Sequence, residues 1–264
     1  MAKSHSTLRT LVSLILLAIV AAVCTALGNW QLRRGAQRDA IMQAIEAGRK
    51  AAPLQLDTRT AAGDLVQWRP AAAHGVWLHD FTVLLDNRNY KGRPGYWVAT
   101  PLLIDAPSRT AVLVLRGWLP RPILPGTSLP ALPRPGGEQD VRGQLVSHVP
   151  RMFELWSFSG KSASALPAKL PGPDGAPPKV QNLALQDLSR ITSLKLLPAV
   201  LEQTAGSGQA TAGAAPFVQE WPLPSTDSAQ NRGYALQWFS FAGIAGIAWL
   251  VVAWRALRRR RQPA

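Results

Sequence analysis

Two uncharged apolar stretches, Leu11–Leu27 (LVSLILLAIVAAVCTAL) and Tyr234–Trp254 (YALQWFSFAGIAGIAWLVVAW), stand near the two ends of this sequence of 264 residues. A helix needs about 17–25 such residues to cross the hydrocarbon core of a bilayer. The sequence therefore predicts two transmembrane helices, with one long insert tethered to the membrane at both of its ends. A cleavable signal peptide is the alternative for the first stretch, because Lys3 and Arg9 precede it as a basic region would.

Basic residues beside the two stretches indicate how they are oriented. Arg255 and the run Arg258–Arg261 follow the second stretch, as Lys3 and Arg9 precede the first. Short basic ends stay in the cytoplasm, whereas long loops cross the membrane largely regardless of charge. We therefore expect both termini to be cytoplasmic and the insert to be periplasmic, in a bacterial inner membrane. The basic tail would also contact anionic membrane lipid.

The composition of the insert excludes several classes of protein. The formal net charge of the chain is +14, but about half of the excess belongs to the basic ends. An exported domain without a basic run between aromatic residues is not expected to bind nucleic acid. Cys24, the only cysteine, lies inside the first apolar stretch, so the insert has no disulfide, thiolate metal site or CxxCH haem attachment.

The pattern along the insert predicts one mainly-β domain behind a juxtamembrane helix. A loose apolar stripe continues the first helix to Gly48, and short extended runs punctuated by Gly and Pro follow Pro53. We expect an antiparallel sandwich or a barrel-like sheet. The expected strands are Leu65–Arg69, Ala73–Leu78, Phe81–Asp86, Tyr96–Ile104, Ala111–Trp118 and Val141–Val146, with Pro198–Glu202 as a further short element. Asn87–Gly92, Gly126–Gly137, Pro167–Pro178 and Ala205–Ala215 are expected to be irregular.

These observations divide the chain into six segments. They are a cytoplasmic N-terminus (1–10), a transmembrane helix (11–28), a juxtamembrane helix (29–52), a β-rich extracytoplasmic domain (53–232), a second transmembrane helix (233–254) and a basic cytoplasmic tail (255–264).

Catalytic chemistry finds little support in the sequence. The four histidines are His5, His74, His79 and His148. On one extended strand His74 and His79 would point to opposite faces and could not share a metal ion. The patterns HExxH, GxSxG, the P-loop and GxGxxG do not occur. We therefore predict no catalytic residue and no metal site.

The ends of the two apolar stretches carry the candidate site. Tyr234 and Trp238 are one helical turn apart, and Gln31 and Gln237 would lie at the same level of the membrane. Small residues on both stretches would let the helices approach closely. Two interpretations stay open, because the aromatic residues could hold a flat apolar molecule such as a porphyrin or could pack against another membrane helix.

Five short motifs resemble those of the surfeit-locus-one family of cytochrome c oxidase assembly proteins. The resemblance would make this chain a bacterial member of that family. In order along the chain the motifs are Leu27–Arg34 (LGNWQLRR), Gly95–Leu102 (GYWVATPL), Arg116–Pro120 (RGWLP), Gln181–Leu183 (QNL) and Tyr234–Phe239 (YALQWF). The resemblance implies an assembly factor that is not an enzyme. It would help to insert or stabilise haem a in the catalytic subunit of a haem–copper oxidase, with that subunit and haem a synthase as partners.

Matching the family motifs to this sequence adds Trp30, Gln31 and Arg34 to the candidate site. Together with Tyr234, Gln237 and Trp238, these residues would bind haem or the client protein. Haem a would be bound transiently. Family members that bind haem often have a histidine where this chain has Asn231, and asparagine is a poor iron ligand.

Two arginines leave further alternatives. Arg34 could pair with a haem propionate or an acidic partner, or could contact lipid phosphate. Arg116 could shape the domain through buried hydrogen bonds or could contact a ligand.

Two other functions remain as alternatives for the whole protein. The first is a membrane-anchored periplasmic binding or sensor domain unrelated to haem, and the second is a membrane-bound hydrolase.

Overall fold

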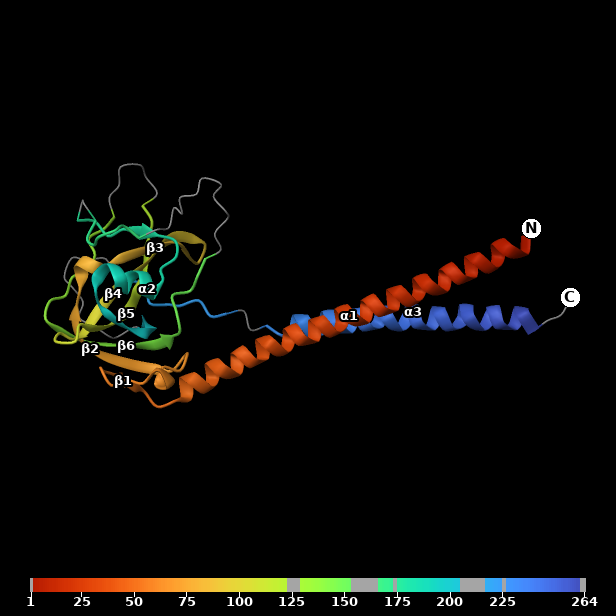
Figure 1. Cartoon of the computed structure of the whole chain (residues 1–264), viewed down its shortest axis with the longest axis horizontal. Coiled ribbons are helices and arrows are strands. Elements are labelled where there is room, and N and C mark those ends of the chain that lie inside the picture. The colour runs from red at the N-terminus through yellow and green to blue at the C-terminus, as the bar shows by residue number, and fades with distance from the viewer. Residues whose placement is uncertain are drawn as a thin grey trace. The chain divides into compact units, whose positions relative to one another are not determined.

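A computed structural model describes residues 2–122, 129–152, 166–172, 175–204, 217–224 and 227–261. The chain forms two compact units, Met1–Gln43 with Pro224–Ala264 and Ala44–Leu223. Figure 1 shows the helices and strands. In chain order they are α1 (Ala2–Lys50), β1 (Leu54–Leu56), the 3-10 turn η1 (Ala62–Asp64), β2 (Pro70–Trp77), the 3-10 turn η2 (His79–Phe81), β3 (Val83–Tyr90), β4 (Arg93–Asp105), β5 (Thr110–Pro120), β6 (Glu138–Val146), β7 (Lys179–Val180), α2 (Leu185–Thr192), β8 (Lys195–Gln203) and α3 (Ala229–Arg261).

The first unit is a pair of long helices, α1 and α3, that lie side by side in opposite directions (Figure 1). Both are long and apolar enough to cross a membrane, which is compatible with a two-span membrane protein. The residues buried between them are 4 and 7 residues apart on α1 and 4 and 10 residues apart on α3, which are steps of four and sums of three and four, as in an antiparallel coiled coil. On α1 and α3 these buried residues, which we call the seam, are Cys24, Gly28, Gly35, Asn231, Ala235 and Ala245.

Small side chains let the helices meet along the seam. A Cβ atom added to Gly28 would lie 2.7 Å from the ring of Phe239, so the phenyl ring occupies the space that a larger residue would need. Close approach of this kind is how helices associate in lipid, where hydrophobic burial supplies no driving force. α1 itself is unbroken from the apolar stretch through the juxtamembrane segment to Lys50.

The second unit is a barrel-like sheet. Its strands follow the order β1-β2-β6-β8-β5-β4-β3-β7, and an added pairing of β2 with β4 closes a ring of β2, β6, β8, β5 and β4. The closing contact is short, with Val76 opposite Leu103 and Trp77 opposite Leu102. Closure removes the open edges that the five ring strands would otherwise present. The mainly-β domain between two apolar helices agrees with the prediction.

Two apolar clusters cover the two faces of the ring. All five ring strands contribute to the inner cluster, which includes Trp77, Val114 and Leu201. The outer cluster includes Leu115 of β5 and is covered by Ile45 at the end of α1 and Leu188 of α2. Since β5 is buried on both faces from Thr110 to Leu119, its sequence is a continuous apolar run rather than an alternating one.

Several local expectations change. The expected strand Leu65–Arg69 is wrong, because Trp68 has a positive φ of 69° and the segment is a turn before β2. The irregular segment Asn87–Gly92 is instead the end of β3 with a turn at Lys91 and Gly92. Short elements β1, β7 and α2 were not expected. The predicted surface segment Ala205–Ala215 lies outside the described residues.

Candidate functional site

Three polar contacts join α1 to α3 and to the residues directly before it, just beyond the apolar part of α1. The Asn231 amide donates to Gln31 Oε1 at 2.7 Å, and Arg38 donates to the carbonyl of Asp227 at 2.6 Å. Arg232 pairs with Asp39 at 2.6 Å. The three contacts hold the helices together where Trp30, Tyr234 and the other predicted site residues stand.

Asn231 belongs to the seam rather than to an open pocket. Its side chain is 7% exposed and faces Gly35, where an added Cβ would lie 3.5 Å from the Asn231 Cβ. One amide hydrogen goes to Gln31, and Asn231 Oδ1 has no hydrogen-bond partner among the described residues. The structure therefore places Gln31 and Asn231 together inside the pair, away from the surface.

Trp30, Arg34 and Tyr234 share one side of the pair, and Trp238 is half-buried beside the seam. Trp30, Arg34 and Arg38 follow one another at single turns of α1, and Arg38 on that side bonds to Asp227, two residues before α3. Arg232, on α3, pairs with Asp39 and marks the opposite side. Tyr234 is two residues from Arg232, which is about 200° around a helix, so it lies on the Trp30 side.

We call this surface the aromatic face and define it by Trp30, Arg34, Tyr234, Gln237, Trp238 and Phe241. Trp30 is 52% exposed and Tyr234 is 50% exposed. Trp238 packs edge-on against Phe241, with ring centroids 6.1 Å apart. Phe241 was not predicted, although its spacing of three from Trp238 is the signal that could have found it. Large exposed aromatics on one side of two adjacent helices suit contact with another apolar surface.

Arg34 supplies the charge of the aromatic face. Its guanidinium is exposed, and its hydrogen bond to Gln37 Oε1 is long at 3.4 Å, beyond the usual range for N–H···O bonds. A guanidinium so weakly held can donate two parallel hydrogen bonds to a carboxylate or phosphate.

The aromatic face holds no histidine, cysteine or methionine, and Tyr234 is its one side chain of a type that ligates haem iron. Met42 lies 12 residues beyond Trp30, about 18 Å along α1, and the only histidine in the sequence of the helical unit, His5, lies 26 residues before Gln31, about 39 Å along α1 at 1.5 Å per residue. Cys24 is buried in the seam. Asn231 is enclosed and bonded to Gln31. Among the residues that define the aromatic face, Tyr234 is therefore the one side chain that could ligate a haem iron.

The central motif Arg116-Gly117-Trp118 lies in the β unit and has a local structural cause. Val98 pairs with Gly117 and Ala99 with Leu115, so Arg116 is the extra residue of a β-bulge, a feature that re-aims a side chain. Gly117 has φ of +140°, and a Cβ there would lie 2.6 Å from the Phe217 Cβ. The Trp118 indole donates to the Arg88 carbonyl at 2.7 Å.

The comparison with family models decides the relationship. The model of the SURF1 family matches residues 18–243. The chain belongs to the SURF1 family. This family consists of cytochrome oxidase assembly factors and is not a family of catalytic enzymes. None of the curated proteins compared with this SURF1-family chain matches it.

Proposed function

We propose that this SURF1-family chain assists the insertion of haem a into, or the stabilisation of, the catalytic subunit of a haem–copper oxidase at the outer face of a bacterial inner membrane. Membership of the SURF1 family carries the proposal. Two apolar helices around one domain suit a two-span protein, with both termini cytoplasmic and the domain periplasmic as the basic ends favour.

In this proposal the aromatic face holds the client. Trp30, Tyr234 and Phe241 offer apolar area at low conformational cost, because each side chain has only two rotatable bonds. Arg34 pairs with an acidic group of the oxidase subunit, or with a propionate of haem a on that subunit. The iron ligands belong to the client, since Asn231 is committed to the seam. Haem a synthase is a further partner, supplying the haem that the held client receives.

The direct experiment is deletion of the gene, followed by the reduced-minus-oxidised spectrum of membranes. We expect the haem a band to fall and to return when the wild-type gene is supplied. An unchanged haem a band with normal oxidase content would overturn the assembly function and leave a periplasmic binding domain unrelated to haem as the better account.

Two neighbouring arginines provide a matched test of the aromatic face. Arg33 and Arg34 are both exposed, but they lie 100° apart around α1 and only Arg34 is on the aromatic face. A photo-crosslinking residue at position 34 is expected to capture the oxidase subunit, and the same residue at position 33 is not. Equal capture from both positions would contradict the assignment of this face.

Haem binding by the protein itself is tested by a visible spectrum. The protein, co-expressed with the enzymes of haem a synthesis and then purified, is expected to be colourless.

A further inference from the structure

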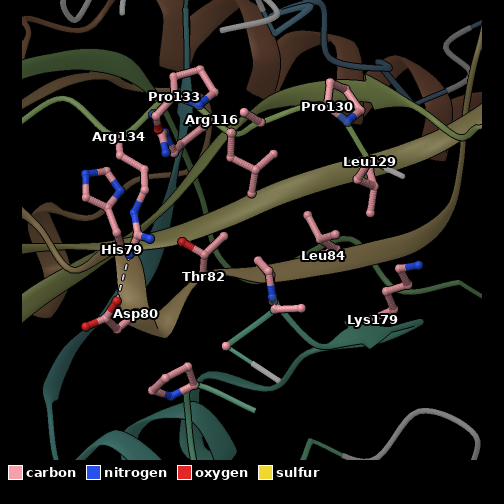
Figure 2. A pocket seen from close by; sticks show the side chains of 16 residues that line it. His79, Asp80, Thr82, Leu84, Arg116, Leu129, Pro130, Pro133, Arg134 and Lys179 are labelled. Atoms are coloured by element: carbon pink, nitrogen blue, oxygen red, sulfur yellow. Dashed lines mark hydrogen bonds and ion pairs between the residues drawn. The ribbon is translucent and has the colours of Figure 1, made fainter. Parts of the chain in front are cut away.

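A cavity of about 530 Å³ lies in the β unit. Figure 2 shows its lining, in which Arg116 and Pro133 stand on one side and Leu84 and Lys179 on another. Most of the wall is apolar, formed by leucine and proline side chains from β3 and from the segments before β6 and β7: Leu84, Leu129, Pro130, Leu132, Pro133, Pro171 and Pro177. Its volume is in the range of sites for small organic ligands.

Arg116 is a buried cation without a counterion. The side chain is 4% exposed, and its guanidinium lies over the rings of Trp77 and Phe217 at 4.7 and 5.1 Å. One hydrogen bond goes from Arg116 to the carbonyl of Pro133 at 2.8 Å. In the part of the chain that the structure describes, no carboxylate forms an ion pair with it. Burial lowers the pKa of Arg116 to about 10, as expected where no anion offsets desolvation.

The other charged groups of the cavity leave an excess of positive charge. Asp80, the only acidic residue of the lining, is already paired with Arg134 at 2.7 Å. His79 donates from Nε2 to the carbonyl of Pro135. Its pKa is lowered by desolvation, and the charge of Arg116 lowers it further, so the imidazole is neutral at pH 7. Arg116 and Lys179 therefore remain as cations without a carboxylate inside the cavity wall.

The backbone aims Arg116 at this space. The bulge in β5 leaves Arg116 without a partner on β4. Its guanidinium lies over the rings of Trp77 and Phe217, and one hydrogen bond from the guanidinium edge goes to the Pro133 carbonyl. A planar carboxylate matches such an edge with two parallel N–H···O bonds.

We propose that the cavity is a binding site for a small organic carboxylate with an apolar body, whose carboxylate pairs with Arg116 while its body lies against Leu84, Leu129 and Leu132. Lys179, at the opposite side of the opening, adds long-range attraction. The proposal is independent of the assembly function and of the aromatic face, because every residue that carries it belongs to the β unit.

The test uses the full-length protein in nanodiscs and two probes of equal shape, 4-phenylbutyrate and its uncharged amide 4-phenylbutyramide, with calorimetric titration and empty nanodiscs as the blank. We expect 4-phenylbutyrate to bind with one-to-one stoichiometry and at least tenfold more tightly than the amide. Equal affinity for the two probes, or no binding of either, would overturn the proposal.

Variants separate the carboxylate contact from folding. Arg116→Gln is expected to weaken 4-phenylbutyrate at least tenfold and the amide less than threefold. Arg88 is a matched control, because it is also buried, lies over Trp97 at 4.5 Å and has its pKa lowered to about 10, yet it does not line the cavity. Arg88→Gln should leave the preference for the carboxylate unchanged. The same loss of preference in both variants would contradict a direct contact with Arg116.

A second pair of changes covers the case in which Arg116→Gln does not fold. Leu132→Trp fills the cavity from a partly exposed position and is expected to abolish binding of both probes. Lys179→Gln is exposed and is expected to weaken 4-phenylbutyrate about threefold without changing the amide. Unaltered carboxylate affinity in both of these variants would place the ligand elsewhere.

Discussion

Glu202 of β8 is a buried carboxyl group whose ionisation should make the stability of the β unit depend on pH. Its side chain is 3% exposed. Desolvation raises its pKa from 4.5 to about 7, although a hydrogen bond donated by the Gln144 amide at 2.7 Å acts in the opposite direction. The folded protein therefore holds this proton more tightly than the unfolded chain does.

The sign of the effect follows from proton linkage. Between pH 4.5 and 7 the unfolded chain loses the Glu202 proton while the folded protein keeps it, so the free energy of unfolding falls as the pH rises. Above pH 7 both states are ionised and the loss is complete. At 1.36 kcal/mol for each pKa unit, the loss amounts to roughly 3 kcal/mol.

Glu202→Gln removes the ionisable group and keeps its shape, and the new carboxamide can still bond to Gln144. We expect this variant to resemble the wild type at pH 5 and to be more stable at pH 8 by roughly 3 kcal/mol. Urea unfolding of the full-length protein in detergent, followed by tryptophan fluorescence at both pH values, measures the difference. Glu46→Gln, at an exposed position, is the control and should leave the pH dependence unchanged. Parallel pH profiles for wild type and Glu202→Gln would refute the reasoning.

Three further substitutions test the seam and the central motif. Gly28→Leu should lower the melting temperature of the helical pair, measured by circular dichroism in nanodiscs, because the new side chain meets the Phe239 ring; adding Phe239→Ala should restore much of the loss, and no recovery would argue against this contact. Asn231→Leu should cost about 1 kcal/mol, and Gln31→Leu added to it should cost little more, whereas additive losses would show that the two amides act separately. Gly117→Ala should destabilise the β unit by about 2 kcal/mol or more, because a φ of +140° is close to glycine-only, and a chemical-unfolding midpoint equal to the wild type's would contradict this.

Hydropathy made the helical parts and most strands predictable, because long apolar runs mark the two helices, short continuous runs mark strands buried on both faces, and alternation marks strands buried on one face. Ala111–Trp118 and Val141–Val146 fall within β5 and β6. The choice between a sandwich and a closed barrel was not predictable, since closure depends on two residue pairs near Trp77 that have no signal in their local sequence. The strand prediction for Leu65–Arg69 was wrong at Trp68. An aromatic residue in an apolar run favours a strand, but the backbone at Trp68 forms a turn.

The sequence indicated which residues to consider for the candidate site, but not how their side chains are arranged around the two helices. Trp30, Arg34 and Tyr234 share a surface, as spacing along each helix suggested. Gln31 does not belong to that surface, because the alternating steps of three and four place it in the seam opposite Asn231. The cavity beside Arg116 was beyond sequence reasoning, since its wall comes from segments far apart in the chain.

The bond between Gln31 and Asn231 joins residues that are 200 positions apart, and this separation has a consequence for biosynthesis. At about 5–20 residues per second, a ribosome needs roughly 10–40 seconds after making Gln31 before its partner exists. During that interval α1 has no α3 beside it, and half of the aromatic face is missing. A truncated chain can therefore insert its first helix without acquiring the complete aromatic face, and under the proposed function it would not engage a client until α3 has been made.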